Sequence, residues 1–176
     1  MNARPVPLTP NFGSIPPILT AQPCWVLWCY MVKDGKYTKV PKRPGGSYAS
    51  TTNPATWSTF AGVRSAYERG GFDGVGIVLT GKPLENGFYL IGLDFDRCLT
   101  GGVLDDDPRQ AIQRLDTYAE ISPSGEGIRL FFLHDKSIPA CKKNVDGKSR
   151  EIYSIARYLT VTGHSLGQAK KVRHVA

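Results

Sequence analysis

The chain has 176 residues, of which 41% are hydrophobic and 21% are charged, a composition typical of one globular domain with a sizeable core. It contains no apolar run of the roughly 20 residues that a membrane span needs. Its first twenty residues are rich in proline and lack the apolar block of a signal peptide, so we expect a cytoplasmic protein with no membrane partner.

Basic residues outnumber acidic ones by 22 to 15, which gives a formal net charge of +7. They gather in three stretches, 33–43, 142–150 and 170–173. Such an excess favours a polyanionic partner, although a solvated basic surface would give the same count. The four cysteines form no C-x-x-C pair, so we expect reduced core residues and no zinc site.

The first half of the chain predicts one hairpin and one helix. A proline-rich arm (1–23) precedes an aromatic and β-branched strand (24–32) and an Asp34-Gly35 turn. Proline and glycine predict a basic loop over 37–50. Asn53-Pro54 predicts a helix start, and Gly70-Gly71 predicts its end. An apolar stripe at helical spacing lies between them: Trp57, Phe60, Val63 and Tyr67.

The second half reads as strands around one further helix. Strands are expected at 74–79, 88–96 and 127–134, and two strands or one bent strand at 151–163. Asp107-Pro108 predicts the start of a helix whose inner face includes Ile112 and Leu115. A loose basic loop is expected at 135–150, and a basic tail at 167–176. The pattern predicts an α/β or α+β domain on a mostly antiparallel or mixed sheet.

Two carboxylates end the apolar run "FYLIGLDFD". Because strand side chains alternate, Asp94 and Asp96 share one face of this strand. Neighbouring carboxylates repel, and a hard divalent cation such as Mg²⁺ or Mn²⁺ would remove that conflict. A third acid, Glu151, opens a later strand. The run Asp105-Asp106-Asp107 is better explained by the start of the following helix, where the macrodipole favours acids.

Two further segments carry polar side chains that suit an anion. In "SPSGEGIRLFF", serine and glycine predict a tight turn whose N–H groups can face a phosphate. Arg129 is the only charge in the strand that follows, and a buried arginine needs a carboxylate or a phosphate. In "RYLTVTGHS", Arg157 and His164 flank a β-branched strand.

These segments, in this order, resemble the primase-polymerase domains of the archaeo-eukaryotic primase superfamily, of the type found in phage, plasmid and mobile-element replication proteins. The resemblance runs over about 24–166 and also includes "STTNPATW" and "DGVGIVLTG". It implies an α+β fold in which an RRM-like antiparallel or mixed catalytic sheet joins a smaller α/β unit, with the active site in the cleft between them. It also implies a prokaryotic or phage origin, a catalytic domain over 24–166, and a tail (167–176) that can lead to a downstream region.

The resemblance further implies a DNA-templated nucleotidyl transferase, a primase or a polymerase, that uses two Mg²⁺ or Mn²⁺ ions. Its partners would be a single-stranded DNA template, a primer, ribo- or deoxynucleoside triphosphates and a helicase domain or protein. Asp94, Asp96 and Glu151 match the metal-binding acids. Matches to the triphosphate-binding positions are Ser124, Gly125, Gly127, Arg129, Arg157 and His164, and Arg129 stands where the family usually has histidine. Template-binding residues are expected in the basic stretches, at Lys39, Lys42, Arg43, Lys142 and Lys143.

Two other functions fit the same residues. A metal-dependent nuclease also uses clustered acids, but it needs no triphosphate clamp. A catalytically silent module that binds single-stranded or origin DNA would keep the fold and the basic surface, and its DNA binding would not depend on Asp94.

Overall fold

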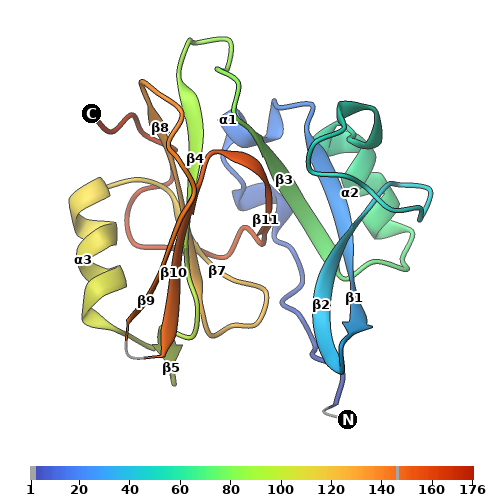
Figure 1. Cartoon of the computed structure of the whole chain (residues 1–176), viewed down its shortest axis with the longest axis horizontal. Helices are drawn as coiled ribbons and strands as arrows, with labels where there is room; N and C mark the ends of the chain where they lie inside the picture. The colour runs from blue at the N-terminus through green and yellow to red at the C-terminus, as the bar shows by residue number, and fades with distance from the viewer. Residues whose placement is uncertain (1–2, 146) are drawn as a thin grey trace.

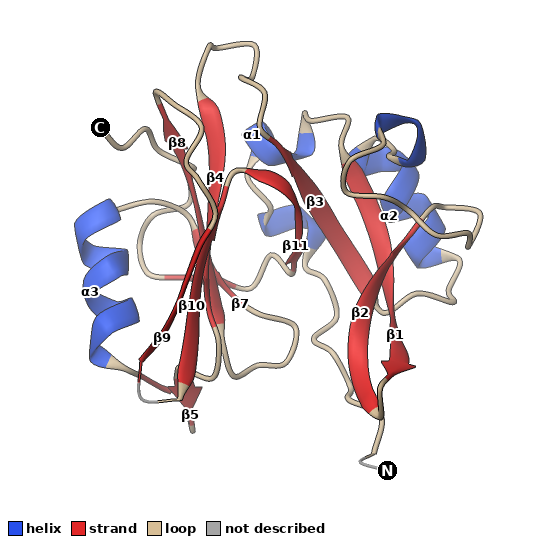
Figure 2. Cartoon of the chain, in the orientation of Figure 1, coloured by secondary structure: helices blue, strands red, loops and turns tan. Residues whose placement is uncertain are grey.

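The computed structural model describes residues 3–145 and 147–176, which form an α+β fold of two antiparallel β-sheets side by side (Figure 1). The four-stranded sheet has the order β11-β3-β1-β2 and the six-stranded sheet the order β12-β7-β8-β4-β10-β9. Figure 2 shows α3 on the outer side of the six-stranded sheet and α2 on the outer side of the four-stranded one. Among the described residues, no helix is both long enough and apolar enough to cross a membrane.

The four-stranded sheet is built from β1 (Trp25–Lys33), β2 (Lys36–Lys42), β3 (Gly74–Thr80) and β11 (Ile155–Val161). The six-stranded sheet is built from β4 (Tyr89–Phe95), β7 (Ala119–Ile121), β8 (Ile128–His134), β9 (Cys141–Val145), β10 (Lys148–Tyr153) and β12 (Ser165–Leu166). A two-stranded ribbon joins β5 (Leu99–Thr100) to β6 (Val103–Leu104). The helices are α1 (Pro17–Thr20), α2 (Phe60–Glu68) and α3 (Asp106–Leu115), with 3₁₀ turns at Phe12–Ser14 and Pro54–Thr56.

The predicted hairpin and the central strands are confirmed. Asp34 and Gly35 both have positive φ, 50° and 73°, as a tight turn between β1 and β2 requires. The 151–163 segment forms two strands that belong to different sheets. The chain changes sheet at Ser154, which is 1% exposed and whose hydroxyl bonds to both N–H and C=O of Ile138.

Both predicted basic loops are wrong in part, since 43–50 of the first and 135–140 of the second lie outside the strands but much of the rest does not. Residues 36–42 form β2, because Pro41 occupies a position on an edge strand, where a missing N–H is tolerated. Residues 141–145 and 148–153 form the β9–β10 hairpin, whose polar side chains conceal the strand pattern. The hairpin places Lys142 directly opposite Glu151.

Both predicted helix starts are also corrected. Asn53 caps only the 3₁₀ turn Pro54–Thr56, and Thr59 caps α2 by accepting a hydrogen bond from the Gly62 N–H. Trp57 therefore lies before the helix. The N-cap of α3 is Asp105 rather than Asp107, and Asp106 and Asp107 lie in its first turn, where acids suit the helix dipole.

The core has two parts because β4 and β8 bury both faces. Ile128, Leu130 and Phe95 form a small cluster with Ala111 of α3. On the other face, Phe131 belongs to a larger cluster shared with the four-stranded sheet, whose members include Trp25, Ile77, Leu79 and Leu159. A Cβ at Gly92 would lie 2.2 Å from Leu159 Cδ1, so a larger residue here would displace the buried Leu159 side chain where β4 meets β11. Asp94 follows Gly92 on this inner face.

The two chain ends in the described structure are packed against the sheets. The proline-rich arm contributes buried Ile15 and Leu19, and the Leu8 and Asn11 N–H groups donate to the carbonyls of Pro123 and Thr162. The basic tail bonds to β8 through Arg173 and Val175.

Candidate active site

Charged side chains form one row across five strands of the six-stranded sheet. The register pairs Glu120 of β7 with Arg129 of β8, Arg129 with Asp94 of β4, and Asp94 with Glu151 of β10. Glu151 is in turn paired with Lys142 of β9. Directly opposed residues share a face, so the five side chains lie on the inner face of the sheet. Its four inner members are held in place by the strands: Glu120, Arg129, Asp94 and Glu151 are at most 8% exposed.

The guanidinium of Arg129 contacts other groups of the protein. Its Nε lies 3.0 Å from Asp94 Oδ1, and its Nη1 donates to the Thr160 carbonyl at 3.1 Å and to the Thr160 hydroxyl of β11. The contact with Asp94 is an ion pair without hydrogen-bond geometry. Among the described residues, no donor hydrogen-bonds Asp94 Oδ1. Asp94 Oδ1 and Arg129 Nε, although neither makes a hydrogen bond among the described residues, therefore neutralise each other only as an ion pair.

Glu151 is hydrogen-bonded on both oxygens. Oε1 accepts from Lys142 Nζ and from the Ser149 hydroxyl at 3.0 Å. Oε2 accepts from the Tyr153 hydroxyl at 2.6 Å and from Arg157 Nη2 at 3.4 Å. Burial raises the pKa of this carboxyl, but the hydrogen bonds from Lys142, Tyr153 and Ser149 outweigh it and lower the pKa to about 2.

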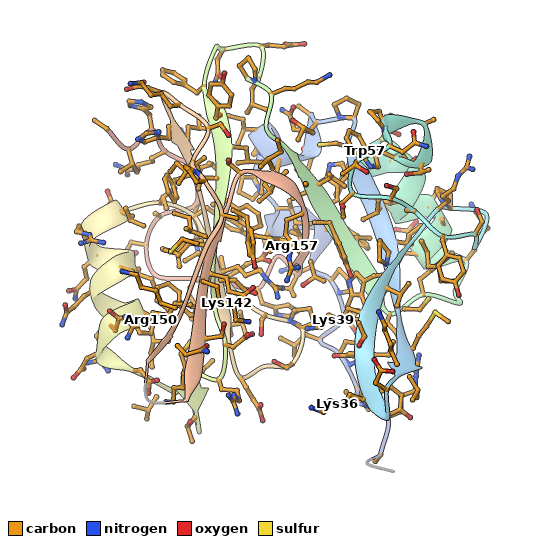
Figure 3. All side chains as sticks on the ribbon, in the orientation of Figure 1. Lys36, Lys39, Trp57, Lys142, Arg150 and Arg157 are labelled. Atoms are coloured by element: carbon orange, nitrogen blue, oxygen red, sulfur yellow. The ribbon has the colours of Figure 1, made fainter. Side chains whose placement is uncertain are left out.

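Asp96 and Lys39 complete the charged group. Asp96 follows the last residue of β4 and is exposed to solvent. Partial desolvation and the neighbouring charges of Asp94 and Glu151 raise the pKa of Asp96, although Arg129 and Lys39 act in the opposite direction. Lys39 comes from β2 of the other sheet (Figure 3). Burial and the charge of Arg129 lower its pKa to about 8, against the attraction of Asp94 and Asp96. The group therefore draws residues from both sheets; the resemblance implies a site between two units, and that location stays an expectation.

The predicted Ser-Gly turn connects β7 to β8 and passes beside the end of β4. Gly125 has φ of 77°, and the Ser122 hydroxyl accepts from the Gly127 N–H at 3.2 Å. A Cβ at Gly127 would lie 2.6 Å from the Phe95 carbonyl oxygen and 3.5 Å from Asp96 Cα. A larger residue at this position would push the turn away from the end of β4 and from the Asp96 backbone. The exposed Ser124 therefore lies on a turn that passes beside Asp96.

Comparison with known proteins decides the family. No family model matches the chain. In an alignment 144 residues long that covers 79% of this chain, it is 33% identical to a DNA primase-polymerase of Nitratiruptor phage NrS-1. The chain belongs to the primase-polymerase family. It spans 19% of the length of that phage protein.

The structure of this primase-polymerase domain separates the predicted template-binding residues. Lys39 and Lys142 lie near the acids. Lys42 and Lys143 occupy alternate positions on β2 and β9, so they face away from the acids. Arg43 is exposed in the loop after β2. His164 hydrogen-bonds through Nε2 to the Thr9 carbonyl of the N-terminal arm at 2.7 Å, whereas Arg157 contacts Glu151.

Sequence reasoning missed four polar residues of this site. Ser149 and Tyr153 flank Glu151 at a spacing of two, so strand alternation could have placed all three on one face. Glu120 is the single charge in "YAEI", and its carboxylate accepts from the Thr162 and Gly163 N–H groups. Thr160 could not have been found, because its contact with Arg129 depends on how the two sheets pack.

The acids fit a divalent cation in part. Carboxylate oxygens are the ligands that Mg²⁺ and Mn²⁺ prefer. Asp94 offers a buried Oδ1 that accepts no hydrogen bond from the described residues. In the described ranges, however, no three acidic, histidine or cysteine side chains converge closely enough to hold one ion. In addition, both oxygens of Glu151 already accept hydrogen bonds from protein donors. Asp94 and Asp96 are the available pair, and Glu151 would join them only after releasing its donors.

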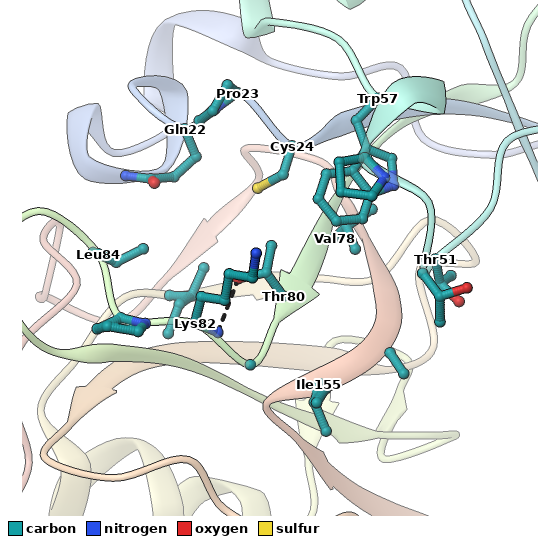
Figure 4. A pocket seen from close by; sticks show the side chains of 16 residues that line it. Gln22, Pro23, Cys24, Thr51, Trp57, Val78, Thr80, Lys82, Leu84 and Ile155 are labelled. Carbon is teal, nitrogen blue, oxygen red and sulfur yellow. Dashed lines mark hydrogen bonds between the residues drawn. The ribbon is translucent and has the colours of Figure 1, made fainter.

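A separate cavity of about 760 Å³ lies away from the acids (Figure 4). It is lined by loop residues and by the ends of β3 and β11, among them Cys24, Trp57, Val78, Lys82 and Ile155. Its mostly apolar wall carries none of the residues of the charged row. We therefore take the charged row, rather than this cavity, as the candidate active site.

Proposed function

We propose that this domain is a DNA-templated nucleotidyl transferase, a primase or a polymerase, that acts in the replication of a phage or another mobile element. One observation carries the proposal: Asp94 and Glu151 face each other between two cationic residues in a buried row. Like charges on directly opposed strand positions repel, so a fold that keeps them needs cations there. The phage relative, which is named for primase-polymerase activity, supports the same reading.

Asp94 and Asp96 would hold Mg²⁺ or Mn²⁺, with Glu151 as the third ligand. Two such ions supply charge stabilisation for the attacking hydroxyl and for the departing pyrophosphate. The side chains and backbone of the protein would position the acids and the triphosphate. Arg129 fixes the Asp94 carboxylate from β8. The glycine turn at Ser124–Gly127 offers backbone N–H groups beside Asp96, where a triphosphate would lie.

Cationic side chains around the acids would bind the phosphates of the nucleotide and the template. Lys39, Lys142 and Arg157 reach this region from β2, β9 and β11. In contrast to the expectation from the family motif, we assign Arg129 to Asp94 rather than to the triphosphate, because its guanidinium already contacts Asp94 and Thr160. A helicase as a partner remains a proposal drawn from the family.

The test is incorporation of labelled nucleotides on a single-stranded DNA template with Mg²⁺ or Mn²⁺, with and without a primer. The wild type is expected to extend, and the Asp94→Asn/Asp96→Asn variant is expected to be inactive with its fold intact. Absence of extension by the wild type under every condition would overturn the proposal. Equal extension by the variant would show that Asp94 and Asp96 are not part of the active site.

A second candidate function is a silent module that binds single-stranded DNA. The observation that favours it is that both oxygens of Glu151 accept hydrogen bonds from protein groups and that Arg129 already contacts Asp94 and Thr160. It predicts salt-dependent DNA binding that is unchanged by Asp94→Asn, together with no nucleotide incorporation.

A further inference from the structure

Four donors from three strands hold the Glu151 carboxylate. Lys142 reaches it from β9, Ser149 and Tyr153 from β10, and Arg157 from β11. The Glu151 side chain is only 7% exposed, whereas those of Lys142 and Arg157 are 58% and 51% exposed. The two cations thus lie over a buried acid while remaining open to solvent. Figure 3 shows both of them between the two sheets.

Two structural features hold Arg157 beside Glu151. Its guanidinium lies 4.8 Å from the ring centroid of Tyr153, so it stacks on a second group that binds Glu151. The preceding residue, Ala156, has φ of 54° at a register shift between β11 and β3. A non-glycine residue in this conformation is strained, and the bulge re-aims the side chain that follows. The strain is consistent with a contact that the fold maintains.

The bound state of Glu151 conflicts with a role as metal ligand. Both of its oxygens accept hydrogen bonds, whereas Oδ1 of the opposed Asp94 accepts none among the described residues and has only the ion-pair contact with Arg129 Nε at 3.0 Å. Lys142 and Arg157 therefore supply to Glu151 the positive charge that a divalent cation would supply in the loaded site. The two kinds of cation compete for one carboxylate.

We propose that Lys142 and Arg157 form a latch that holds Glu151 in a metal-free resting state and releases it when a divalent cation binds at Asp94 and Asp96. Release frees two cationic side chains beside the acids, where the phosphates of an incoming nucleotide would meet them. The inference rests on the proposed function, because it takes these acids as the metal site. It adds an exchange of partners at Glu151 that couples metal binding to nucleotide binding.

Direct Mn²⁺ titration of the nucleotide-free protein, by calorimetry or by the loss of the free-ion electron paramagnetic resonance signal, tests the latch. Lys142→Ala should tighten Mn²⁺ binding about fivefold, since half-exposed ion pairs contribute roughly 1 kcal/mol. Lys142→Ala/Arg157→Ala should tighten it further, yet weaken nucleotide binding in the presence of Mn²⁺. Lys143→Ala is the matched control, one residue along β9 on the opposite face, and should change neither.

Glu151→Gln separates the latch from a general charge effect. If the latch acts through Glu151, adding Lys142→Ala to Glu151→Gln should give no further gain in Mn²⁺ affinity. Unchanged or weaker Mn²⁺ binding by Lys142→Ala, or an equal gain in the Glu151→Gln background, would overturn the latch and leave the proposed function standing. Equal Mn²⁺ binding by the wild type and by Asp94→Asn/Asp96→Asn would instead overturn the metal site itself.

Discussion

Replacement of Arg129 by methionine tests whether this arginine is an internal partner of Asp94. The arginine is 5% exposed and contacts Asp94 and both polar groups of Thr160. Removal of one member of a buried ion pair leaves an uncompensated charge and costs about 3–5 kcal/mol. Methionine fills much of the volume, so the expected loss of unfolding free energy is about 4 kcal/mol.

A second substitution then isolates the charge. In Arg129→Met/Asp94→Asn the buried carboxylate is gone, and about half of the lost stability should return. Urea unfolding in the presence of a chelator, followed by the fluorescence of the buried Trp25 and Trp28, gives both values. Arg150→Met is the matched control. Arg150 pairs with Asp107 on the opposite face, its side chain is 32% exposed, and its loss should cost less than about 1 kcal/mol.

The outcome that refutes this assignment is a cost below about 1 kcal/mol for Arg129→Met, or a double variant whose loss is the sum of the two single losses. Either result would mean that Arg129 and Asp94 do not stabilise each other. The arginine would then be available to a triphosphate, as the family motif implies.

Three further predictions concern neighbouring groups. The pKa of Glu151 is lowered from its ordinary 4.5 to about 2, so its stabilisation is complete above about pH 4.5 and is lost as the pH falls through 2. The wild type should therefore lose about 2 kcal/mol more unfolding free energy than Glu151→Gln between pH 4.5 and 2, measured in the presence of a chelator. This value is discounted because Lys142 and Arg157 are half-exposed. An equal pH dependence in the two proteins would contradict the assignment. Gly127→Ala should reduce nucleotide incorporation at least roughly tenfold, because its Cβ would press on the Phe95 carbonyl beside Asp96; full activity would show that the turn has room. Lys39→Ala should weaken binding to single-stranded DNA and lower its salt dependence by about one counterion, whereas an unchanged slope in log affinity against log salt would exclude a phosphate contact.

The sequence predicts the individual strands of the site better than their arrangement. Alternation in "LIGLDFD" places Asp94 and Asp96 on one face, and the structure confirms a strand that buries both faces. The charged row could not be predicted, because it depends on the register between strands that are distant in sequence. The β9–β10 hairpin was missed because its alternate residues are polar on both faces, which hides the period of two.

Arg129 illustrates the same limit. Its isolation in an apolar strand predicts a buried arginine with an anionic partner, and the structure provides a carboxylate, that of Asp94. Whether the partner of Arg129 is a carboxylate or a phosphate depends on the pairing of β8 with β4, and no local sequence pattern predicts that pairing.

The central claim is that the paired acids of the row serve templated nucleotide addition. The most direct measurement is incorporation of each of the four nucleotides, supplied singly with Mn²⁺, on homopolymeric DNA templates annealed to a primer. The wild type should add only the complement of each template, and Asp94→Asn/Asp96→Asn should add none while its unfolding transition remains cooperative. Addition that ignores the template, or addition by the double variant at the wild-type rate, would contradict the claim.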